Sequence, residues 1–292
     1  MRHQPRATGY NHCVDSAKIA IIGGGNMGRA LLGGLLRDGT PRGQVRIGEA
    51  SGAARHELHR EFGVFVSDDN AAVLEGAAIA VIAVKPQDAE AVLVPLGARL
   101  REQQSLVVSV AAGIEVRSLQ AWCGTPVAVV RAMPNRPALV GAGVTALYAP
   151  AGIAVAQRAL AEHVMRAVGA VVWLADESAL DVVTALSGSG PAYFFLLAEQ
   201  MMAAAVLLGL EPAAARTLAV ETLHGAGVLA HAGDGDLARL RAGVTSKGGT
   251  TEAALQVLDG AQGIGPLVQR ALAAAADRSR ELAARFAAKG HG

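Results

Sequence analysis

The chain has 292 residues, of which 52% are hydrophobic, 17% are charged and 3% are aromatic, and its formal net charge is +1. This length allows two domains that each bury a core. Because the chain has no basic run and few aromatic residues, it can neither neutralise phosphates nor stack on bases extensively, which disfavours nucleic-acid binding. The two cysteines, Cys13 and Cys123, imply no disulfide framework, which fits a cytoplasmic protein.

Residues 1–17 are polar and irregular and lack the apolar core of a signal peptide. We therefore expect a disordered N-terminal extension, or a start that lies upstream of the true one. His56 and His59 have a metal-like spacing, but no further ligand cluster accompanies them. A solvated helix face is the favoured interpretation, and we expect no metal site.

From residue 18 to residue 175, short apolar runs alternate with helical segments. The strand-like runs are nearly continuous in valine, isoleucine and alanine, which is typical of a parallel sheet covered on both faces. This pattern predicts an α/β fold with a Rossmann-like doubly wound sheet. We expect strands at 18–22, 45–47, 64–66, 78–84, 105–111, 127–132, 140–147 and 170–174, and helices at 29–37, 54–62, 71–75 and 87–96.

A glycine-rich loop follows the first predicted strand and precedes a helix. Gly23, Gly25 and Gly28 fit the G-x-G-x-x-G spacing of dinucleotide-binding loops. In such loops the first glycine permits the tight turn, the second admits the pyrophosphate, and the third lets helix and strand approach closely. Nucleotide binding is therefore favoured over a purely structural turn.

The end of the second predicted strand bears on the choice of cofactor. Glu49 lies about 20 residues beyond the loop, where an acid bonds the ribose 2′-hydroxyl and favours NADH. Alternatively Glu49 points to solvent, and Ser51 and Arg55 meet the 2′-phosphate of NADPH. Both readings stay open at this stage.

Two further strand ends should face the cofactor, because ligands of such sheets bind at the carboxyl ends of the strands. The first is Ala83, Val84, Lys85 and Pro86, in which Lys85 can equally be a solvated strand end. The second is Ala111, Ala112 and Gly113, whose small residues would let a nicotinamide lie flat.

Residues 176–292 are predicted to be helical, with a small-residue break at 187–191. The segment 192–210 is apolar enough to resemble a membrane span, but Glu199 and Gln200 interrupt it. We favour a helix buried in a core or a subunit interface. Since too many apolar residues lie on these helices for a small bundle, we expect an intertwined dimer.

The segment 244–251 is predicted to be a loop that leads into the N-terminus of a helix. The adjacent Gly248 and Gly249 let the backbone pass close to a ligand, and free amides at a helix start favour a carboxylate or phosphate. Taken alone, an ordinary helix cap is the simpler interpretation.

These motifs together resemble the pyrroline-5-carboxylate reductase family. The resemblance runs from Lys18 to the last helix and rests on IIGGGNMGRALLGGL, AVKPQ, VVSVAAG, RAMPNRPALVGAGVTAL, ALSGSGPAYFF and VTSKGGTT, in this order. It implies hydride transfer from NADPH or NADH to the C=N bond of 1-pyrroline-5-carboxylate, which gives L-proline. It also implies a homo-oligomer built from intertwined dimers.

The resemblance assigns roles to individual residues. The cofactor would contact Gly23, Gly24, Gly25, Asn26, Met27, Gly28, Asn70, Ala83, Val84, Lys85, Pro86, Ala111, Ala112 and Gly113. Asn70 reads equally as a helix cap. The substrate would be held by Glu177, Val244, Ser246, Gly248, Gly249, Thr250 and Thr251. Thr251 is the candidate catalytic residue, bonding the imine nitrogen, while the amides of Gly248, Gly249 and Thr250 hold the carboxylate.

The chain departs from the family pattern at two loop positions. Lys247 stands where many members have proline, and Arg136 stands where threonine is frequent. We favour a solvated Lys247. The end of the second strand lacks the Asn-Arg pair of some members, which weakens any expectation of strict NADPH preference.

Two rival functions use the same nucleotide fold. A β-hydroxyacid dehydrogenase would need a catalytic lysine on a helix, but the helical half holds only Lys247, in a loop, and Lys289, near the terminus. A non-catalytic dinucleotide sensor would keep the glycine loop without any need for the 244–251 pattern.

Overall fold

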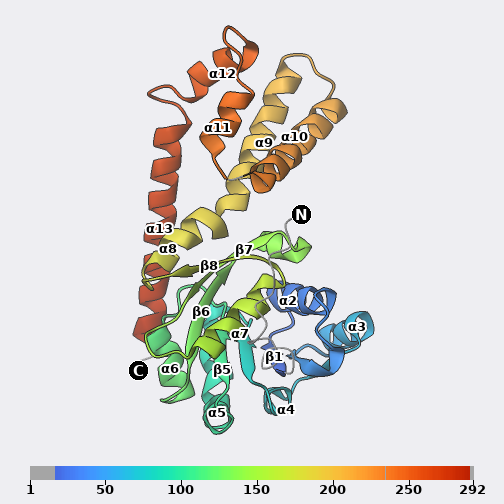
Figure 1. Cartoon of the computed structure of the whole chain (residues 1–292), viewed down its shortest axis with the longest axis vertical. Helices are drawn as coiled ribbons and strands as arrows, with labels where there is room; N and C mark the ends of the chain where they lie inside the picture. Colours follow the sequence, from blue (N-terminus) through green and yellow to red (C-terminus); the bar gives the residue numbers. More distant parts are fainter. Residues whose placement is uncertain (1–16, 234, 290–292) are drawn as a thin grey trace. The chain divides into compact units, whose positions relative to one another are not determined.

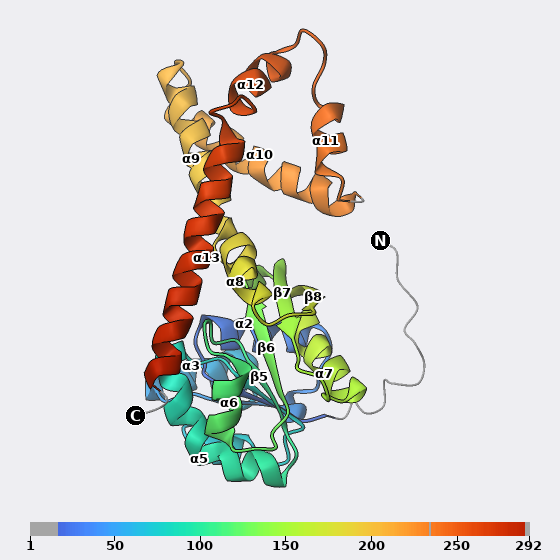
Figure 2. The ribbon, with the colours of Figure 1, turned by 90° about the vertical axis from the view of Figure 1, so that its left-hand side faces the viewer.

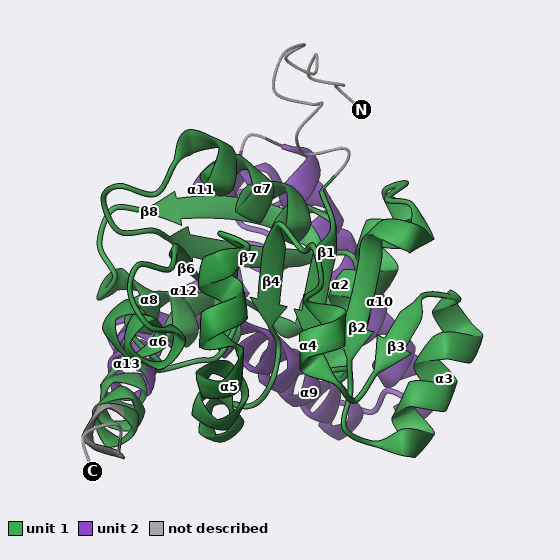
Figure 3. Ribbon diagram, turned by 90° about the horizontal axis from the view of Figure 1, so that it is seen from below, with its two compact units in different colours: residues 1–188, 276–292 green, residues 189–275 purple. Residues whose placement is uncertain are grey.

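The computed structural model describes residues 17–233 and 235–289, which form two compact units. The sheet unit comprises the chain up to Gly188 together with the segment from Ala276 onward, and the helical unit is Ser189–Ala275 (Figure 3). We predicted the boundary near residue 175. The structure places it later, because the segment after the last strand is hydrogen-bonded to the sheet, as described below.

Eight strands form one sheet in the order β3-β2-β1-β4-β5-β6-β7-β8. Figure 1 labels β1, β5, β6, β7 and β8. The order reverses between β1 and β4, and such a switch point is where doubly wound sheets bind their ligands. The strands are β1 Ile19–Ile22, β2 Val45–Gly48, β3 Phe65–Ser67, β4 Ile79–Ile82, β5 Leu106–Ser109, β6 Val129–Pro134, β7 Gly143–Tyr148 and β8 Gly169–Leu174.

The sheet is parallel except at one pair, where β7 runs antiparallel to β6. The sheet is thus mostly parallel, as the strand composition predicted, and this pair is the exception. Only the short 3₁₀ segment η3 (Arg136–Val140) separates the two strands, and a parallel pair needs a crossover of about a dozen residues or more. A short connection of this kind forces the chain to turn back on itself.

Helices cover both faces of the sheet, as the apolar strands predicted. Successive residues of β1 alternate between two cores: Ile19 and Ile21 face one, and Ala20 and Ile22 face the other. Helices α2 (Asn26–Arg37), α3 (Gly52–Phe62) and α7 (Val155–Arg166) supply the first core, and α4 (Asn70–Val73), α5 (Ala89–Glu102) and α6 (Val116–Cys123) supply the second. Short 3₁₀ turns η1 (Arg42–Gln44) and η2 (Pro86–Asp88) complete the connections.

The predicted break at 187–191 is narrower in the structure. Helix α8 (Ala179–Val183) continues as a wider π-helical turn, η4 (Thr184–Gly188), and only Ser189 is a bend before α9 (Gly190–Leu207). The hydroxyls of Thr184 and Ser187 donate to carbonyls four residues earlier, which satisfies the small polar side chains within the helix.

The helical unit begins with two long helices, α9 and α10 (Pro212–Ala232), which pack against each other (Figure 2). Two shorter helices follow, α11 (Leu237–Gly243) and α12 (Thr250–Leu258), and α13 (Ile264–Lys289) runs from this unit back into the sheet unit. Pro191 and Pro212 lie in the first turns of their helices, where proline's missing N–H costs nothing.

Helix α9 is exposed on nearly all sides within one chain. Among the described residues, one helical stretch, Ala179–Leu207, is long and apolar enough to cross a membrane, and 6% of its most apolar window is buried. Phe194, Phe195 and Leu207 are 60%, 62% and 88% exposed. The alternative of a helix buried in its own chain's core is therefore wrong, and burial in a subunit interface remains.

Residues 1–16, Asp234 and residues 290–292 lie outside the described residues, and with them most of the predicted N-terminal extension. Ala17, which we assigned to that extension, is buried in the core of the sheet unit. Cys123 is also buried, and this burial raises the pKa of its thiol to about 12, although Arg101 acts in the opposite direction. This thiol is therefore protonated at neutral pH and is not a candidate nucleophile.

Candidate functional site

The glycine-rich loop lies at the carboxyl end of β1, next to the switch point. Gly23 has φ +110°, and a Cβ there would lie 2.7 Å from the carbonyl oxygen of Ala83. A Cβ on Gly28 would lie only 1.9 Å from the carbonyl oxygen of Gly23. Both glycines are therefore required by the fold, as the sequence pattern predicted for the turn and for helix packing.

Gly25 differs from its two neighbours in the motif. It is the N-cap of α2, no side chain caps the helix there, and a Cβ would meet nothing within 4 Å. The fold itself therefore does not require glycine at this position. The open space lies at a helix N-terminus, where amides without acceptors favour a phosphate group, so the residues present fit a dinucleotide pyrophosphate.

Glu49 is fixed at the end of β2 rather than turned to solvent. Its Oε2 accepts from the Gly24 amide at 3.0 Å, and its Oε1 accepts from the Ser51 amide at 2.8 Å. These bonds place a carboxylate directly beside the glycine-rich loop. The position matches that of an acid that bonds the ribose of NADH.

Ser51 and Arg55, the alternative partners for a 2′-phosphate, are both engaged elsewhere. Ser51 caps α3 by accepting from the Ala54 amide. The Arg55 guanidinium donates to the carbonyl oxygens of Glu49 and Ala50 and forms an ion pair with Asp68 at 2.9 Å. Arg55 would have to leave these partners to bind a phosphate.

Asn70 is not the helix cap. The N-cap of α4 is Asp69, whose carboxylate accepts from the Ala71 amide at 2.8 Å, and Asn70 is the first helical residue. A Cβ on Gly48 would lie 2.3 Å from Asn70 Oδ1, so the amide group of Asn70 lies against the end of β2. This leaves Asn70 a candidate cofactor ligand at the switch-point edge.

The two other predicted cofactor segments follow β4 and β5. Ala83 donates its amide to Ile22, and Lys85 is exposed at the N-cap of η2. Gly113 has φ +76°, and a Cβ there would lie 3.4 to 3.6 Å from Ala283 and Phe286 of α13. One side of Gly113 is therefore covered by α13, which bounds the turn that follows β5.

Glu177 lies in the sheet unit and is bonded to that unit. Its Oε1 accepts from the Val116 amide at 2.7 Å and from Arg131 Nη1 at 2.8 Å. The Arg131 side chain, on β6, is 10% exposed and that of Glu177 is 27% exposed. Arg131 was not among our sequence candidates, although it lies in the motif RAMPN and is a rare near-buried charge.

The loop 244–251 joins α11 to α12 in the helical unit. Gly248 has φ +73°, which explains its glycine, and Gly249 is the N-cap of α12. An ion pair at 3.0 Å between Arg241, in the last turn of α11, and Asp259, the C-cap of α12, links the two helices. Thr250 and Thr251 are then the first two residues of α12.

Two of the three amides expected to hold a carboxylate are already bonded within the loop. The Gly248 amide donates to Glu252 Oε2 at 2.7 Å, and the Gly249 amide donates to the carbonyl oxygen of Ser246 at 3.0 Å. Each of these two amides would have to leave its present acceptor to bind a substrate carboxylate. Within the described residues, the amides of Thr250 and Thr251 have no acceptor, because they occupy the first turn of α12.

The remaining singled-out side chains lie at the surface. Lys247 and Arg136 are exposed, which agrees with the solvated interpretation of Lys247. His56 and His59 are exposed on α3, and His59 Nδ1 lies 3.1 Å from the carbonyl oxygen of Val64. This agrees with the solvated helix face that we favoured over a metal site.

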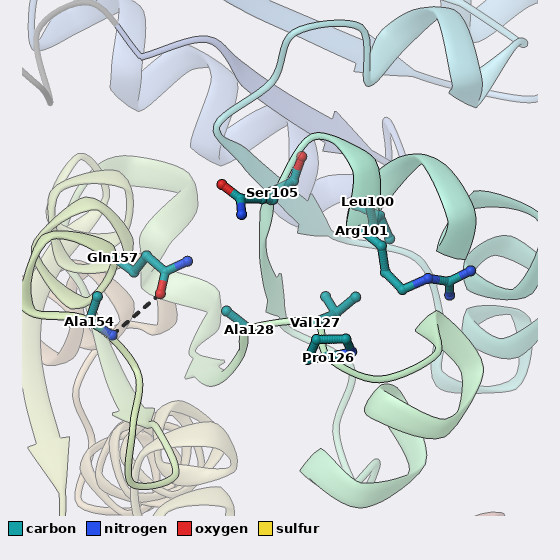
Figure 4. A pocket seen from close by; sticks show the side chains of 9 residues that line it. Leu100, Arg101, Ser105, Pro126, Val127, Ala128, Ala154 and Gln157 are labelled. Carbon is teal, nitrogen blue, oxygen red and sulfur yellow. Dashed lines mark hydrogen bonds between the residues drawn. The ribbon is translucent and has the colours of Figure 1, made fainter.

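A cavity of about 440 Å³ opens at the other edge of the sheet, near the amino ends of β5 and β6 (Figure 4). The glycine-rich loop lies at the carboxyl edge, so this cavity is not part of the predicted cofactor site. Its lining residues are Leu100, Arg101, Gln104, Ser105, Pro126, Val127, Ala128, Ala154 and Gln157. It holds no carboxylate or histidine to act as an acid or base.

Two family models match the chain. Residues 18–113 match the model described as NADP oxidoreductase, coenzyme F420-dependent. Residues 177–282 match the model described as pyrroline-5-carboxylate reductase dimerisation. The first match covers the glycine-rich loop and the strand ends, and the second covers α9 and the 244–251 loop.

Individual relatives are similar over nearly the whole chain. A pyrroline-5-carboxylate reductase of Pseudomonas aeruginosa is 44% identical over 270 residues, which cover 92% of this chain and 98% of the relative. The solved structure of a pyrroline-5-carboxylate reductase from Coxiella burnetii has a TM-score of 0.88 at 38% identity, covering 91% of this chain and 98% of that one. A pyrroline carboxylate reductase of Plasmodium falciparum, solved with NADP bound, has a TM-score of 0.77 at 25% identity, covering 92% and 99%.

Proposed function

This chain belongs to the pyrroline-5-carboxylate reductase family, and from that premise we propose which of its residues carry the reaction. The family's enzymes are NAD(P)H-dependent oxidoreductases that act on a cyclic imine. The chain thus reduces the C=N bond of 1-pyrroline-5-carboxylate to L-proline, the last step of proline biosynthesis.

The observation that carries the cofactor assignment is the open space at Gly25. A glycine that no neighbour in the fold requires, at the uncapped start of α2, is explained by a ligand that needs the space of a side chain. Gly23, Gly24, Gly25, Asn26, Met27 and Gly28 would hold the pyrophosphate, with Asn70, Ala83 to Pro86 and Ala111 to Gly113 at the same edge. The bound cofactor supplies the hydride for the imine carbon.

The substrate carboxylate would bind at the start of α12. The Thr250 and Thr251 amides have no acceptor in the described chain, and the helix dipole adds to their attraction for an anion. The Glu252 carboxylate accepts a hydrogen bond from the Gly248 amide. This bond stabilises the glycine turn beside the site. Val244, Ser246, Gly248 and Gly249 would then form the walls of the site.

Thr251 is the proposed contact to the imine nitrogen. Its side chain is half-buried and, within the described residues, has no hydrogen-bond partner, so its hydroxyl is available to a ligand. A threonine hydroxyl is a weak acid, so water or an already protonated substrate supplies the proton. The contribution of these residues is therefore orientation and charge stabilisation, which together lower the barrier by several kcal/mol.

A direct assay tests the function. The purified chain is mixed with 1-pyrroline-5-carboxylate and either NADPH or NADH, and the loss of reduced-cofactor absorbance is compared with L-proline formed. We expect one L-proline for each cofactor oxidised. Cofactor oxidation without proline, or no oxidation with either cofactor, would contradict the assignment.

We propose that Glu49 makes NADH a usable cofactor beside NADPH. Replacing Glu49 by alanine removes an acceptor for the ribose hydroxyls, and a hydrogen bond to a charged group is worth about 2 kcal/mol. The KM for NADH should therefore rise roughly 10- to 50-fold, while the KM for NADPH changes little. Steady-state kinetics with both cofactors measure the two values.

Two further variants control this experiment. Glu49→Gln keeps an oxygen for the Gly24 or Ser51 amide and separates loss of charge from loss of loop structure. Glu102→Ala, at the exposed end of α5, should leave both KM values unchanged. Equal changes for both cofactors in Glu49→Ala would mean that Glu49 only supports the loop.

We propose that the helical unit forms an intertwined dimer through α9. Its exposed phenylalanines and leucines form an apolar surface of the kind that marks a subunit interface, and the segment matches a dimerisation family. Light scattering should give a dimer or a larger assembly at micromolar concentration.

We further propose a cytoplasmic location, consistent with the absence of a disulfide pattern.

A charged residue in this surface should separate the subunits. Phe195→Glu places a carboxylate where a phenylalanine is 62% exposed in one chain, and burying that charge in an interface is costly. The light-scattering mass should fall to that of one chain. Val94→Glu, at a 55% exposed site on α5, is the matched control and should stay assembled. A wild-type monomer, or a Phe195→Glu variant of unchanged mass, would contradict this proposal.

A further inference from the structure

Two donors of the sheet unit, the Val116 amide and the Arg131 guanidinium, meet at one carboxylate oxygen of Glu177. Glu177 Oε1 accepts from the amide of Val116 at 2.7 Å and from Nη1 of Arg131 at 2.8 Å. We call these three groups the Glu177 cluster. The Arg131 side chain is 10% exposed, so the ion pair is largely shielded from water and screening of its charges is weak.

Each group belongs to a different element. Val116 is the first residue of α6, so its amide is one of the donors that a helix start leaves without an intrahelical partner. Arg131 lies on β6, where it pairs in register with Ser109, the last residue of β5. The chain leaves β5 at Ser109 and reaches α6 at Val116, so the turn that contains Ala111, Ala112 and Gly113 lies between these two points.

The cluster therefore fixes the exit of this turn to the strand beside its entrance. On its other side, Gly113 is covered by Ala283 and Phe286 of α13. Ala111 is buried, and its amide donates to Ser109 Oγ at 3.3 Å. The turn is thus held at its entrance, at its outer side and, through Glu177, at its exit.

We propose that Arg131 and Glu177 are positioning residues for the Ala111–Gly113 turn, which presents a flat surface to the nicotinamide ring. This inference rests on the proposed cofactor site. It gives Glu177 a different role from the direct substrate contact that the family resemblance implied. Glu177 acts through the α6 amide and Arg131, and its effect on the reaction is exerted on the cofactor side.

The segment 177–188, which connects the last strand to the helical unit, also supports a positioning role for Glu177. Glu177 precedes α8, and the segment 177–188 is fastened to the sheet unit at two further points. Asn135 Nδ2 donates to the carbonyl oxygen of Ser187 at 3.1 Å, and Ser279 Oγ donates to Asp181 Oδ1 at 2.6 Å. Of these three fastenings, the Glu177 cluster is the one that includes the start of α6.

The test measures NADPH affinity without substrate, by fluorescence titration of the full chain, together with KM for each substrate. Arg131→Met and Glu177→Ala should each raise the Kd for NADPH about tenfold, which corresponds to about 1.4 kcal/mol, because a displaced turn would contact the nicotinamide ring less closely. The KM for 1-pyrroline-5-carboxylate should change less than about twofold. The double variant should be no worse than either single one, since both remove the same interaction.

Conservative variants separate positioning from simple loss of stability. Glu177→Gln keeps an oxygen for the Val116 amide and should bind NADPH more tightly than Glu177→Ala, and Arg131→Lys should recover part of the loss in Arg131→Met. Asn135→Asp removes the donor to the Ser187 carbonyl, keeps an oxygen for the Val144 amide and involves neither α6 nor α13, so it should lower the melting temperature but leave the Kd for NADPH unchanged.

Other outcomes overturn the proposal. If Glu177→Gln raises the KM for 1-pyrroline-5-carboxylate while its NADPH affinity stays at the wild-type value, Glu177 touches the substrate. If Arg131→Met folds and binds NADPH like the wild type, the cluster does not position the turn. If the wild-type chain itself binds neither NADPH nor NADH, the proposed cofactor site fails, which is a separate result.

Discussion

Gly25→Ala is expected to weaken NADPH binding by about 100-fold without lowering the melting temperature. The new methyl group meets nothing within 4 Å in the folded chain, so the fold tolerates it. It would, however, occupy the space in which we place the cofactor pyrophosphate, above the amides that start α2. The methyl group would push a bound phosphate away from those donors. Losing two or three charge-assisted hydrogen bonds costs several kcal/mol.

Fluorescence titration with NADPH and thermal unfolding measure the two quantities separately. Gly43→Ala is the matched control, because it also has open space around its Cβ but lies in η1, away from the loop. Gly28→Ala gives the opposite pattern, since its methyl group would lie 1.9 Å from the Gly23 carbonyl oxygen and must destabilise the loop itself. Unchanged NADPH affinity in Gly25→Ala would show that the cofactor lies elsewhere.

Thr251→Ala should lower kcat by about 10- to 100-fold, the range of a lost proton-transfer contact. Thr251 is the second residue of α12, and its half-buried side chain has no partner within the described chain. Removing its hydroxyl therefore breaks no hydrogen bond within the described residues, and the loss falls on the reaction. NADPH affinity should stay at the wild-type value, because the proposed cofactor contacts lie in the sheet unit.

Two variants sharpen this result. Thr251→Ser keeps a hydroxyl at the same place and should keep most of the activity. Thr217→Ala removes an exposed threonine hydroxyl of α10 that donates to the carbonyl oxygen of Ala213, so kcat should not change. If kcat of Thr251→Ala equals that of the wild type, Thr251 has no part in the mechanism.

The central strands and the glycine-rich loop could be predicted because local sequence determines them. β1 and β4 are runs of apolar residues that fill two cores at once, and Gly23 and Gly28 have backbone surroundings that admit no other residue. The direction of β7 could not be read from its own residues. It depends on the short connection from β6, in which the sequence pattern did not reveal the 3₁₀ turn η3.

The hydrogen bonds of the candidate site were less predictable than its residues. The Gly248 amide is bonded to Glu252, four residues later, because the left-handed Gly248 turns its N–H toward the first turn of α12. Asp69, rather than Asn70, caps α4, a difference of one residue that sequence patterns do not resolve. Glu177 meets Val116 and Arg131 from 61 and 46 residues away, and only the tertiary fold brings these groups together.

The most direct test of the reductase activity follows the hydrogen that is transferred from the cofactor to the imine. The purified chain is supplied with 1-pyrroline-5-carboxylate and NADPH that carries deuterium at the transferable position of its nicotinamide, and the product is examined by NMR and mass spectrometry. We predict L-proline with one deuterium on the ring carbon of the former C=N bond. Unlabelled proline, deuterium at another carbon, or oxidised cofactor without proline would contradict a reductase that transfers hydride directly to the cyclic imine.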